Sequence, residues 1–407
     1  MLFGFPRIDG PRGLRLLIAA ALAAVLAYAA ILAVLYARHA WIVDTSGRPF
    51  FIDFVAIWSS GKLALGGAAA SAYDGHAIHA AEIATVGHPV AGYLGWPYPP
   101  AYFFVAGALA ALPFTGAFLL WIVATLALYA AATGAVARSW IAGLLACAVP
   151  FTLSDLYDGQ NGLLMAALMA AALLAMERRP LLSGALLGLM TLKPQFGLLF
   201  PLTLLLDGRW RTIAAAIVTT VTLNALAGVV FGFDTFGAFL HTLPDTGKTL
   251  VVQGSVGWNK LQTVYGVTRY LGGGADFAAL LQGIAACASV VATALLWRGR
   301  QPFARKAAFL AAACLLATPY AFFYDLPVLA VAAAFLHRER AFDAVEGIVL
   351  AAAFAATIAF VLFAVPAGLA AILLVLGLVV RRNWQAARKT SASLNAAAWA
   401  SPSGRSP

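Results

Sequence analysis

Long apolar stretches, separated by short polar turns, run along almost the whole chain. A helix needs about 20 mostly apolar residues, usually about 17–25, to cross a bilayer. Residues 14–37 meet this requirement directly. The later stretches predict helices at 115–137, 139–155, 161–176, 181–192, 194–206, 211–231, 275–297, 305–319, 321–337, 343–362 and 365–380. The pattern predicts an all-α polytopic membrane protein, a bundle of about 12 transmembrane helices with both ends of the chain in the cytoplasm.

Two longer polar segments, residues 38–98 and 232–274, interrupt this pattern and are expected on the outer side. The apolar stretch 99–113 is too short to span a bilayer and follows interfacial aromatic residues, so we expect it half-sunk in the outer leaflet. One transmembrane domain is therefore predicted over 1–382, with the two outer loops on its functional side. The Ala-, Ser- and Pro-rich stretch 383–407 is predicted to be a disordered cytoplasmic tail.

Composition excludes a soluble globular protein, because the 407 residues are 63% hydrophobic and only 10% charged. The formal net charge of +10 could suggest a nucleic-acid partner. That partner is not expected, because the Lys and Arg residues form short clusters between apolar runs instead of lining one polar face. A basic N-terminus precedes the first helix and favours a cytoplasmic start, through Arg7, Arg12 and Arg15.

Lys193 lies where two predicted helices meet within residues 181–206. A single tilted helix over the same residues is the alternative, and it would place 207–211 outside and reverse every later assignment. Pro194 favours the break, and the nearest acid after it is Asp207. A lysine at this depth needs an anion from another helix or from a ligand, and a phosphate suits it. Snorkelling towards the headgroups is an equal alternative.

Asp53 stands among large apolar residues just before a helical run. It could cap that helix, form an interfacial ion pair or project into a cavity, and the residue pattern alone favours the first two. A second polar cluster comprises Asp155, Asp158, Gln160 and Asn161. This cluster is either an ordinary turn or a place where carboxylates and amides bind the hydroxyls of a sugar.

The second outer loop carries His241, Trp258 and Lys260, and it either covers a substrate or simply connects two helices. Further along, aromatic side chains adjoin a carboxylate at Tyr320, Tyr324 and Asp325. That combination suits stacking on a sugar and also suits an interfacial aromatic belt.

No metal site is predicted. The three cysteines all lie within apolar segments and are interpreted as buried thiols: Cys147, Cys287 and Cys314. His76 and His79 have no third ligand at helical spacing, so a wet interfacial helix face is the preferred interpretation.

Several short motifs follow one another along this frame. They are the Asp of the first outer loop, Gly-x5-Tyr-Asp at Gly67–Asp74, Tyr98-Pro99-Pro100, Gly159-Gln160-Asn161, Gly-x3-Gly-x4-Lys-Pro ending at Lys193-Pro194, and Arg209-Trp210-Arg211. In this order they resemble glycosyltransferase family 87, relatives of the polyprenol-phosphate-mannose-dependent α-mannosyltransferases with the GT-C fold. The resemblance covers residues 14–340.

The resemblance implies transfer of a hexose, with mannose as the expected sugar, from a polyprenyl-phosphate donor to a lipid or glycan acceptor. The reaction would take place at the periplasmic face of a multi-pass protein of the bacterial inner membrane, among membrane lipids. Asp53 is then the general base, and Lys193 is the first choice for binding the donor phosphate, with Lys62 and Lys260 in reserve. The leaving group is a lipid monophosphate, so neither a metal nor another cofactor is required.

The sugar and the acceptor are expected to contact the remaining candidates, which are Tyr98, Asp155, Asp158, Gln160, Asn161, His241, Trp258, Tyr320, Tyr324 and Asp325. Some relatives carry a histidine in the segment where this chain has Tyr320 and Tyr324, which leaves the acceptor open. A transporter or flippase of lipid-linked sugars is the main alternative, because the same intramembrane charges could line a translocation path. A non-catalytic assembly partner is a third.

Overall fold

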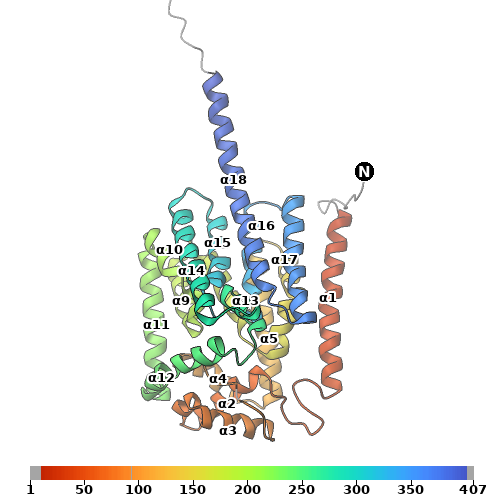
Figure 1. Ribbon diagram of the computed structural model, residues 1–407, viewed down its shortest axis with the longest axis vertical. Helices are drawn as coiled ribbons and strands as arrows, with labels where there is room; N and C mark the ends of the chain where they lie inside the picture. The colour runs from red at the N-terminus through yellow and green to blue at the C-terminus, as the bar shows by residue number, and fades with distance from the viewer. Residues whose placement is uncertain (1–10, 93, 401–407) are drawn as a thin grey trace, which may run out of the picture.

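The computed structural model describes residues 11–92 and 94–400, and within them every regular element is a helix (Figure 1). The all-α prediction is therefore confirmed. Six helices are long and apolar enough to cross a membrane, or seven if one bent pair forms a single span, as far as the described residues go. These six are α1 (Pro11–Ala37), α5 (Phe114–Ala137), α11 (Trp210–Phe231), α14 (Ala275–Arg298), α17 (Ala344–Phe363) and α18 (Gly368–Ala400). The predicted count of about 12 spans is not confirmed.

The other predicted membrane helices are present but short. The bent pair, whose axes meet at 65°, replaces the single helix predicted at 139–155. Pro150 begins the second member of this pair, since its ring is tolerated only in the first turn of a helix. The short helices are α6 (Trp140–Cys147), α7 (Pro150–Asp158), α8 (Gly162–Ala175), α9 (Pro180–Leu189), α10 (Phe200–Leu206), α15 (Phe303–Ala317) and α16 (Pro327–Glu339).

Burial separates the middle of the bundle from its edge. α8, α15 and α16 are apolar nearly all round and almost wholly buried, as expected for helices that contact protein on every side. α8 packs against α5, α9 and α16, and α15 packs against α14, α16 and α18. The long helices instead expose large apolar side chains such as Val123, Val229 and Leu295, which suits a surface that faces lipid.

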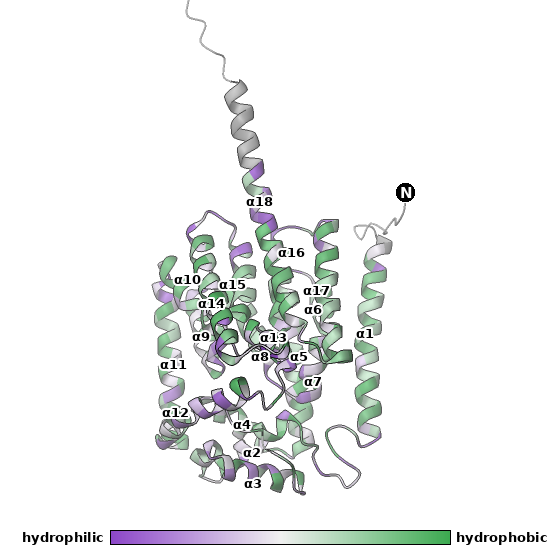
Figure 2. Ribbon diagram, viewed as in Figure 1, coloured by the Kyte–Doolittle hydropathy of each residue, from purple (hydrophilic) through white to green (hydrophobic). Residues whose placement is uncertain are grey.

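We call the end of the bundle that carries α2, α3 and α12 the outer end, and the opposite end the inner end. α1 begins and α18 ends at the inner end, so both helices reach the same end of the bundle (Figure 1). Polar residues gather along the outer-end helices and at the inner-end turns (Figure 2). The outer-end helices and α13 are α2 (Asp53–Leu65), α3 (Gly75–Val86), α4 (Phe103–Ala110), α12 (Asp234–Gly247) and α13 (Val264–Tyr270).

Single-turn segments mark the breaks between helices. They are 3₁₀ turns except for η5, which is a π turn. Their bounds are η1 (Ala69–Tyr73), η2 (Pro100–Tyr102), η3 (Met190–Leu192), η4 (Pro194–Gly197), η5 (Lys248–Val252), η6 (Trp258–Lys260) and η7 (Phe323–Asp325).

The segment 181–206 forms two short arms that meet at Lys193. Arg209, which follows the second arm, donates to the carbonyl oxygen of Met176, which precedes the first, at 2.9 Å. Both ends of the segment therefore lie at the inner end, and the alternative of a single tilted helix is wrong. Similarly, Arg338 donates to the carbonyl oxygen of Val136 at 3.0 Å, which brings a third basic turn to this end.

The structure differs from prediction at the C-terminus, where α18 continues past Arg382 to Ala400. A disordered tail was predicted from residue 383. The added stretch is rich in alanine, the residue with the highest helix propensity, which accounts for the helix. Arg7 and residues 401–407 lie outside the described residues.

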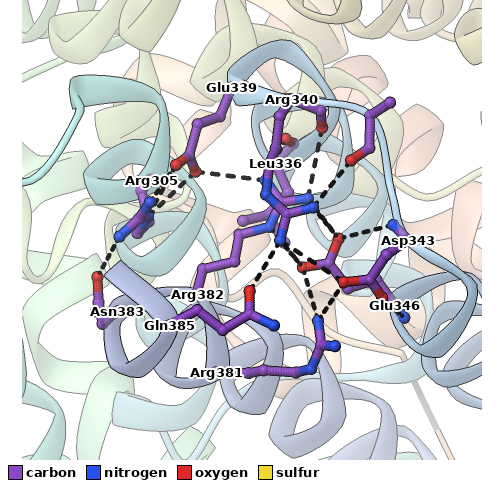
Figure 3. A network of polar contacts seen from close by, with 11 residues as sticks. Arg305, Leu336, Glu339, Arg340, Asp343, Glu346, Arg381, Arg382, Asn383 and Gln385 are labelled. Carbon is purple, nitrogen blue, oxygen red and sulfur yellow. Dashed lines mark hydrogen bonds and ion pairs between the residues drawn. The ribbon is translucent and has the colours of Figure 1, made fainter. Parts of the chain in front are cut away.

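A network of buried ion pairs joins four helices at the inner end (Figure 3). Arg382 of α18 is 1% exposed, and two of its nitrogens donate to the carboxylate of Glu346 of α17, at 2.8 and 2.9 Å. Arg305 of α15 pairs with Glu339 of α16, to which Arg382 also donates. A buried charge is tolerated only when it is paired, so this network fixes the four helices relative to one another.

We expect Glu346→Gln to lower the free energy of unfolding by about 3 kcal/mol, because the buried guanidinium of Arg382 then lacks its main counter-charge. Thermal unfolding in detergent measures the effect. Asp343→Asn is the control, since Asp343 is 39% exposed and Asn preserves its role as a helix cap. Equal shifts in Tm for the two variants would contradict the assigned role of the network.

Candidate active site

The candidate site lies where several broken helices meet. α7 ends at Gly159, whose φ of 67° is in the left-handed region that favours glycine, and α8 begins at Gly162. Lys193 separates η3 from η4, and η7 precedes α16. Irregular backbone within a membrane bundle is stable only where it is buried in protein or lines a cavity, and such breaks are typical of ligand sites.

Asp53 is the first residue of α2, and its side chain contacts the break between α7 and α8. Its Oδ2 accepts a hydrogen bond from Nε2 of Gln160 at 2.8 Å. The N-cap position of α2 belongs to Ile52, whose side chain cannot cap. Of the roles considered from the sequence, the structure therefore favours the one in which this half-buried carboxylate faces the interior.

The amide of Gln160 has a defined orientation. Its Oε1 accepts from the hydroxyl of Tyr98 at 3.1 Å and from the backbone N–H of Asn161 at 3.4 Å. With the oxygen engaged by two donors, the NH₂ group must face Asp53. Tyr98 and Gln160 thus hold the carboxylate of Asp53 in place.

Lys193 has partners on two other segments. Its Nζ donates to Oδ1 of Asp325 at 2.6 Å and to Oδ1 of Asn161 at 3.0 Å. Asn161 in turn donates to the hydroxyl of Tyr102 at 3.3 Å. Lys193 is only 5% exposed, so its positive charge needs a buried anion. Asp325, from another part of the chain, supplies that anion.

Because Gln160 and Asn161 are neighbours, one chain of contacts connects Asp53 to Lys193. We call the set Asp53, Gln160, Asn161, Lys193 and Asp325 the central network. Tyr324 lies beside it, with the ammonium of Lys193 5.0 Å from the centre of its ring.

The other two candidate acids occupy different settings. Asp155 is 1% exposed and accepts from the backbone N–H of Leu163 at 3.1 Å, which satisfies a donor in the first turn of α8. Asp158, at the end of α7, lies within electrostatic range of both Asp53 and the exposed Lys260. Lys260 is thus an exposed cation near the carboxylate of Asp158.

Some predicted candidates lie elsewhere. His241 is exposed on α12, and Trp258 donates to the carbonyl oxygen of Val251 while its ring faces Arg269. Tyr320 packs against a small apolar cluster formed by Val251, Tyr265 and Ala278. Lys62 follows Asp53 by nine residues, about two and a half helical turns, so it lies on the opposite face of α2.

Glu82 of α3 was not among the predicted site residues. It is fully buried and accepts from the backbone N–H groups of Leu94 and Gly95, all at 3.2 Å. These bonds hold the segment that leads to Tyr98. Burial raises the pKa of Glu82 to about 7 although the two amides favour the charged form, and the charge of Asp53 adds to the rise. The only signal in the sequence was an acid on an otherwise amphipathic helix.

Among the described residues, no group of three or more His, Cys, Asp or Glu side chains is placed to hold a metal ion. The central network itself consists of one acid held by an amide, beside a second acid paired with a lysine. Such a set can accept a proton and bind the hydroxyls of a polar substrate.

Fold and site together define a polytopic helical membrane protein with a buried polar centre at its helix breaks. The sequence profile of glycosyltransferase family 87 matches residues 96–319. The chain therefore belongs to this family and is a membrane glycosyltransferase, as the motif resemblance indicated. No curated protein and no solved structure matches it. The matched region includes Gln160, Asn161 and Lys193, whereas Asp53 and Asp325 lie outside it.

Glu82 generates a prediction about pH. Its pKa is raised from the ordinary 4.5, so its contribution to stability is fully present below pH 4.5 and is lost as the pH rises through about 7. Glu82→Gln is neutral at every pH, and we expect its Tm to fall less than that of the wild type across this window. Glu177→Gln, at an exposed position, is the control and should retain the wild-type dependence. Parallel Tm curves for wild type and Glu82→Gln would contradict the prediction.

Proposed function

We propose that this chain transfers a hexose, with mannose as the expected sugar, from a polyprenyl-phosphate donor to a lipid or glycan acceptor. The reaction takes place at the outer end, facing the periplasm of a bacterial inner membrane. The observation that carries the proposal is the orientation of Asp53, which points into the bundle and is held by Gln160 beside the buried Lys193–Asp325 pair. No cofactor enters the reaction, because the donor carries its own leaving group.

Asp53 is the proposed general base. Gln160 engages Oδ2, and we assign proton transfer to Oδ1. As the acceptor hydroxyl attacks the anomeric carbon, a new carbon–oxygen bond forms and the hydroxyl proton passes to Asp53. The bond from the anomeric carbon to the phosphate oxygen breaks on the opposite face, and the lipid monophosphate departs. A positioned base contributes about 10²–10⁴ to the rate of such a step.

The cations divide between two proposed roles. The sequence favours Lys193 for the donor phosphate, but Asp325 already balances its charge. We therefore assign Lys193 to fixing Asn161, and Lys260 to the departing phosphate, because Lys260 is exposed and lies within electrostatic range of Asp158. A cation near the leaving group stabilises the charge that develops there.

The hexose is proposed to bind between Asp53 and Lys260. Asp158 accepts from its hydroxyls. Tyr324 lies beside this position, with its ring stacked on Phe322 and facing the ammonium of Lys193. Asp155 and Asp325 are assigned to holding the backbone, since each accepts a backbone N–H group.

We expect Asp53→Asn to lower sugar transfer by about 10²–10⁴. The assay follows transfer of radiolabel from polyprenyl-phosphate mannose in isolated membranes. Asp44→Asn, an equivalent change at an exposed turn of the same outer segment, should retain wild-type transfer. Undiminished transfer by Asp53→Asn would remove Asp53 from the role of base. Label that crosses the membrane without forming product would instead favour a transporter of lipid-linked sugars.

Gln160→Glu tests the positioning role of the amide. It places a second carboxylate within hydrogen-bond distance of Asp53, and two carboxylates so close share a proton. We expect the acidic limb of the profile of kcat/KM against pH to move upwards by about one unit or more, with activity recovering at high pH. Gln253→Glu, at an exposed position, is the control. A loss of activity that is equal at every pH would indicate a purely structural role.

A further inference from the structure

A concave surface lies on the face of α2 that points away from Asp53. It is a groove of about 600 Å³ between α2, α3 and the start of α5. Trp58, Lys62 and Leu63 line it from α2, Ala84 and Thr85 from α3, and Phe114 from α5. Because Lys62 is half a turn out of phase with Asp53, a molecule in this groove lies on the opposite face of α2 from the carboxylate of Asp53.

The groove lies at the level where α5 leaves the outer end of the bundle. The indole Nε1 of Trp58 donates to the carbonyl oxygen of Leu112 at 3.1 Å, and α5 begins two residues later at Phe114. Two apolar side chains beside the groove are exposed, Leu65 at 55% and Leu112 at 39%. Tryptophan next to exposed leucine at the end of a membrane helix is typical of the boundary between headgroups and acyl chains.

The exposed apolar residues further along α5 do not continue the groove. Leu119, Leu120 and Val123 are 43%, 54% and 63% exposed, but they follow Phe114 by about one and a half to two and a half helical turns and lie on the opposite face of α5. The apolar edge of the groove is instead formed by Leu65 and Leu112, which a hydrocarbon chain can contact as it leaves the groove.

The charge of the groove indicates which kind of lipid headgroup it can bind. Lys62 is the one ionisable side chain among the described residues that line it, and its ammonium lies 4.7 Å from the centre of the Trp58 ring. The hydroxyls of Ser59 and Thr85 bond to each other at 2.7 Å on the same wall. A single positive charge above apolar walls complements one negative phosphate.

We propose that the groove around Lys62 binds one anionic phospholipid of the outer leaflet. The phosphate pairs with Lys62, the glycerol portion fills the space beside Ala84 and Thr85, and an acyl chain leaves past Leu65 and Leu112. The site is separate from the proposed sugar transfer. The bound lipid contacts the face of α2 that lies opposite Asp53.

The test uses the full-length protein in phosphatidylcholine nanodiscs that contain a minor fraction of phosphatidylglycerol, with bound lipid counted by native mass spectrometry. The wild type should retain one phosphatidylglycerol. Lys62→Gln should weaken its retention about fivefold, the loss of one interfacial ion pair. Lys62→Arg should preserve binding, and Ala84→Trp, which fills the groove, should abolish it. Lys248→Gln, at another exposed outer lysine, should bind like the wild type.

Equal losses in Lys62→Gln and Lys248→Gln would overturn the proposal, because they would indicate general attraction to an anionic surface. Displacement of the lipid by soluble glycerol phosphate would also overturn it, since the site would then recognise a free phosphate. Retention in Ala84→Trp, provided that its Tm equals that of the wild type, would place the lipid elsewhere. Asp53→Asn should bind the lipid normally, so this result is independent of the sugar-transfer assay.

Discussion

A lysine ammonium buried in an apolar bundle must be paired, and Lys193 imposes that requirement on the rest of the structure. Its two partners, Asp325 and Asn161, lie on different helix breaks, 132 and 32 residues away along the chain. Losing either partner would leave a buried charge or a buried polar group without compensation, which is costly in a medium of low dielectric constant. The ammonium therefore brings three breaks to one place. Gln160 is carried there as the neighbour of Asn161, and it holds Asp53.

The two ends of the bundle use buried charge in different ways. At the inner end, Arg305 and Arg382 are paired with carboxylates of neighbouring helices, and these pairs link helices that are already continuous. At the outer end the charges lie at helix breaks, where backbone N–H and C=O groups need hydrogen-bond partners outside the helices. Asp155 and Asp325 each accept a backbone N–H group, so part of their role is to make an irregular backbone stable at depth. Asp53 differs from both, because the contact described for its carboxylate is with a side-chain amide.

Helix positions could be predicted from the sequence, because apolar runs and prolines depend on local chain chemistry alone. Pro194 marked the break beside Lys193, and Pro150 was a signal for the bend between α6 and α7 that the uninterrupted apolar run concealed. The partner of Lys193 could not be predicted, since nothing local relates it to a residue as distant as Asp325. The position of Asp53 could not be predicted either. Local pattern favoured a helix cap, whereas the structure shows a long-range hydrogen bond with Gln160. The predicted number of spans is not confirmed, because a buried short helix and a membrane helix are equally apolar and the sequence does not separate them.

The position of Asp53 depends on how closely α2 approaches α4. A Cβ atom at Gly61 would lie 2.1 Å from the carbonyl oxygen of Ala106, so only glycine permits this packing. α4 belongs to the region that the family profile matches, whereas α2 lies outside it. The matched region thus provides the frame and the amide of Gln160, and the glycine contact sets the unmatched helix at the depth where its first residue meets that amide. The contact of Asp53 with Gln160 consequently depends on the close packing at Gly61. The two residues are separated by just over two turns of the same helix.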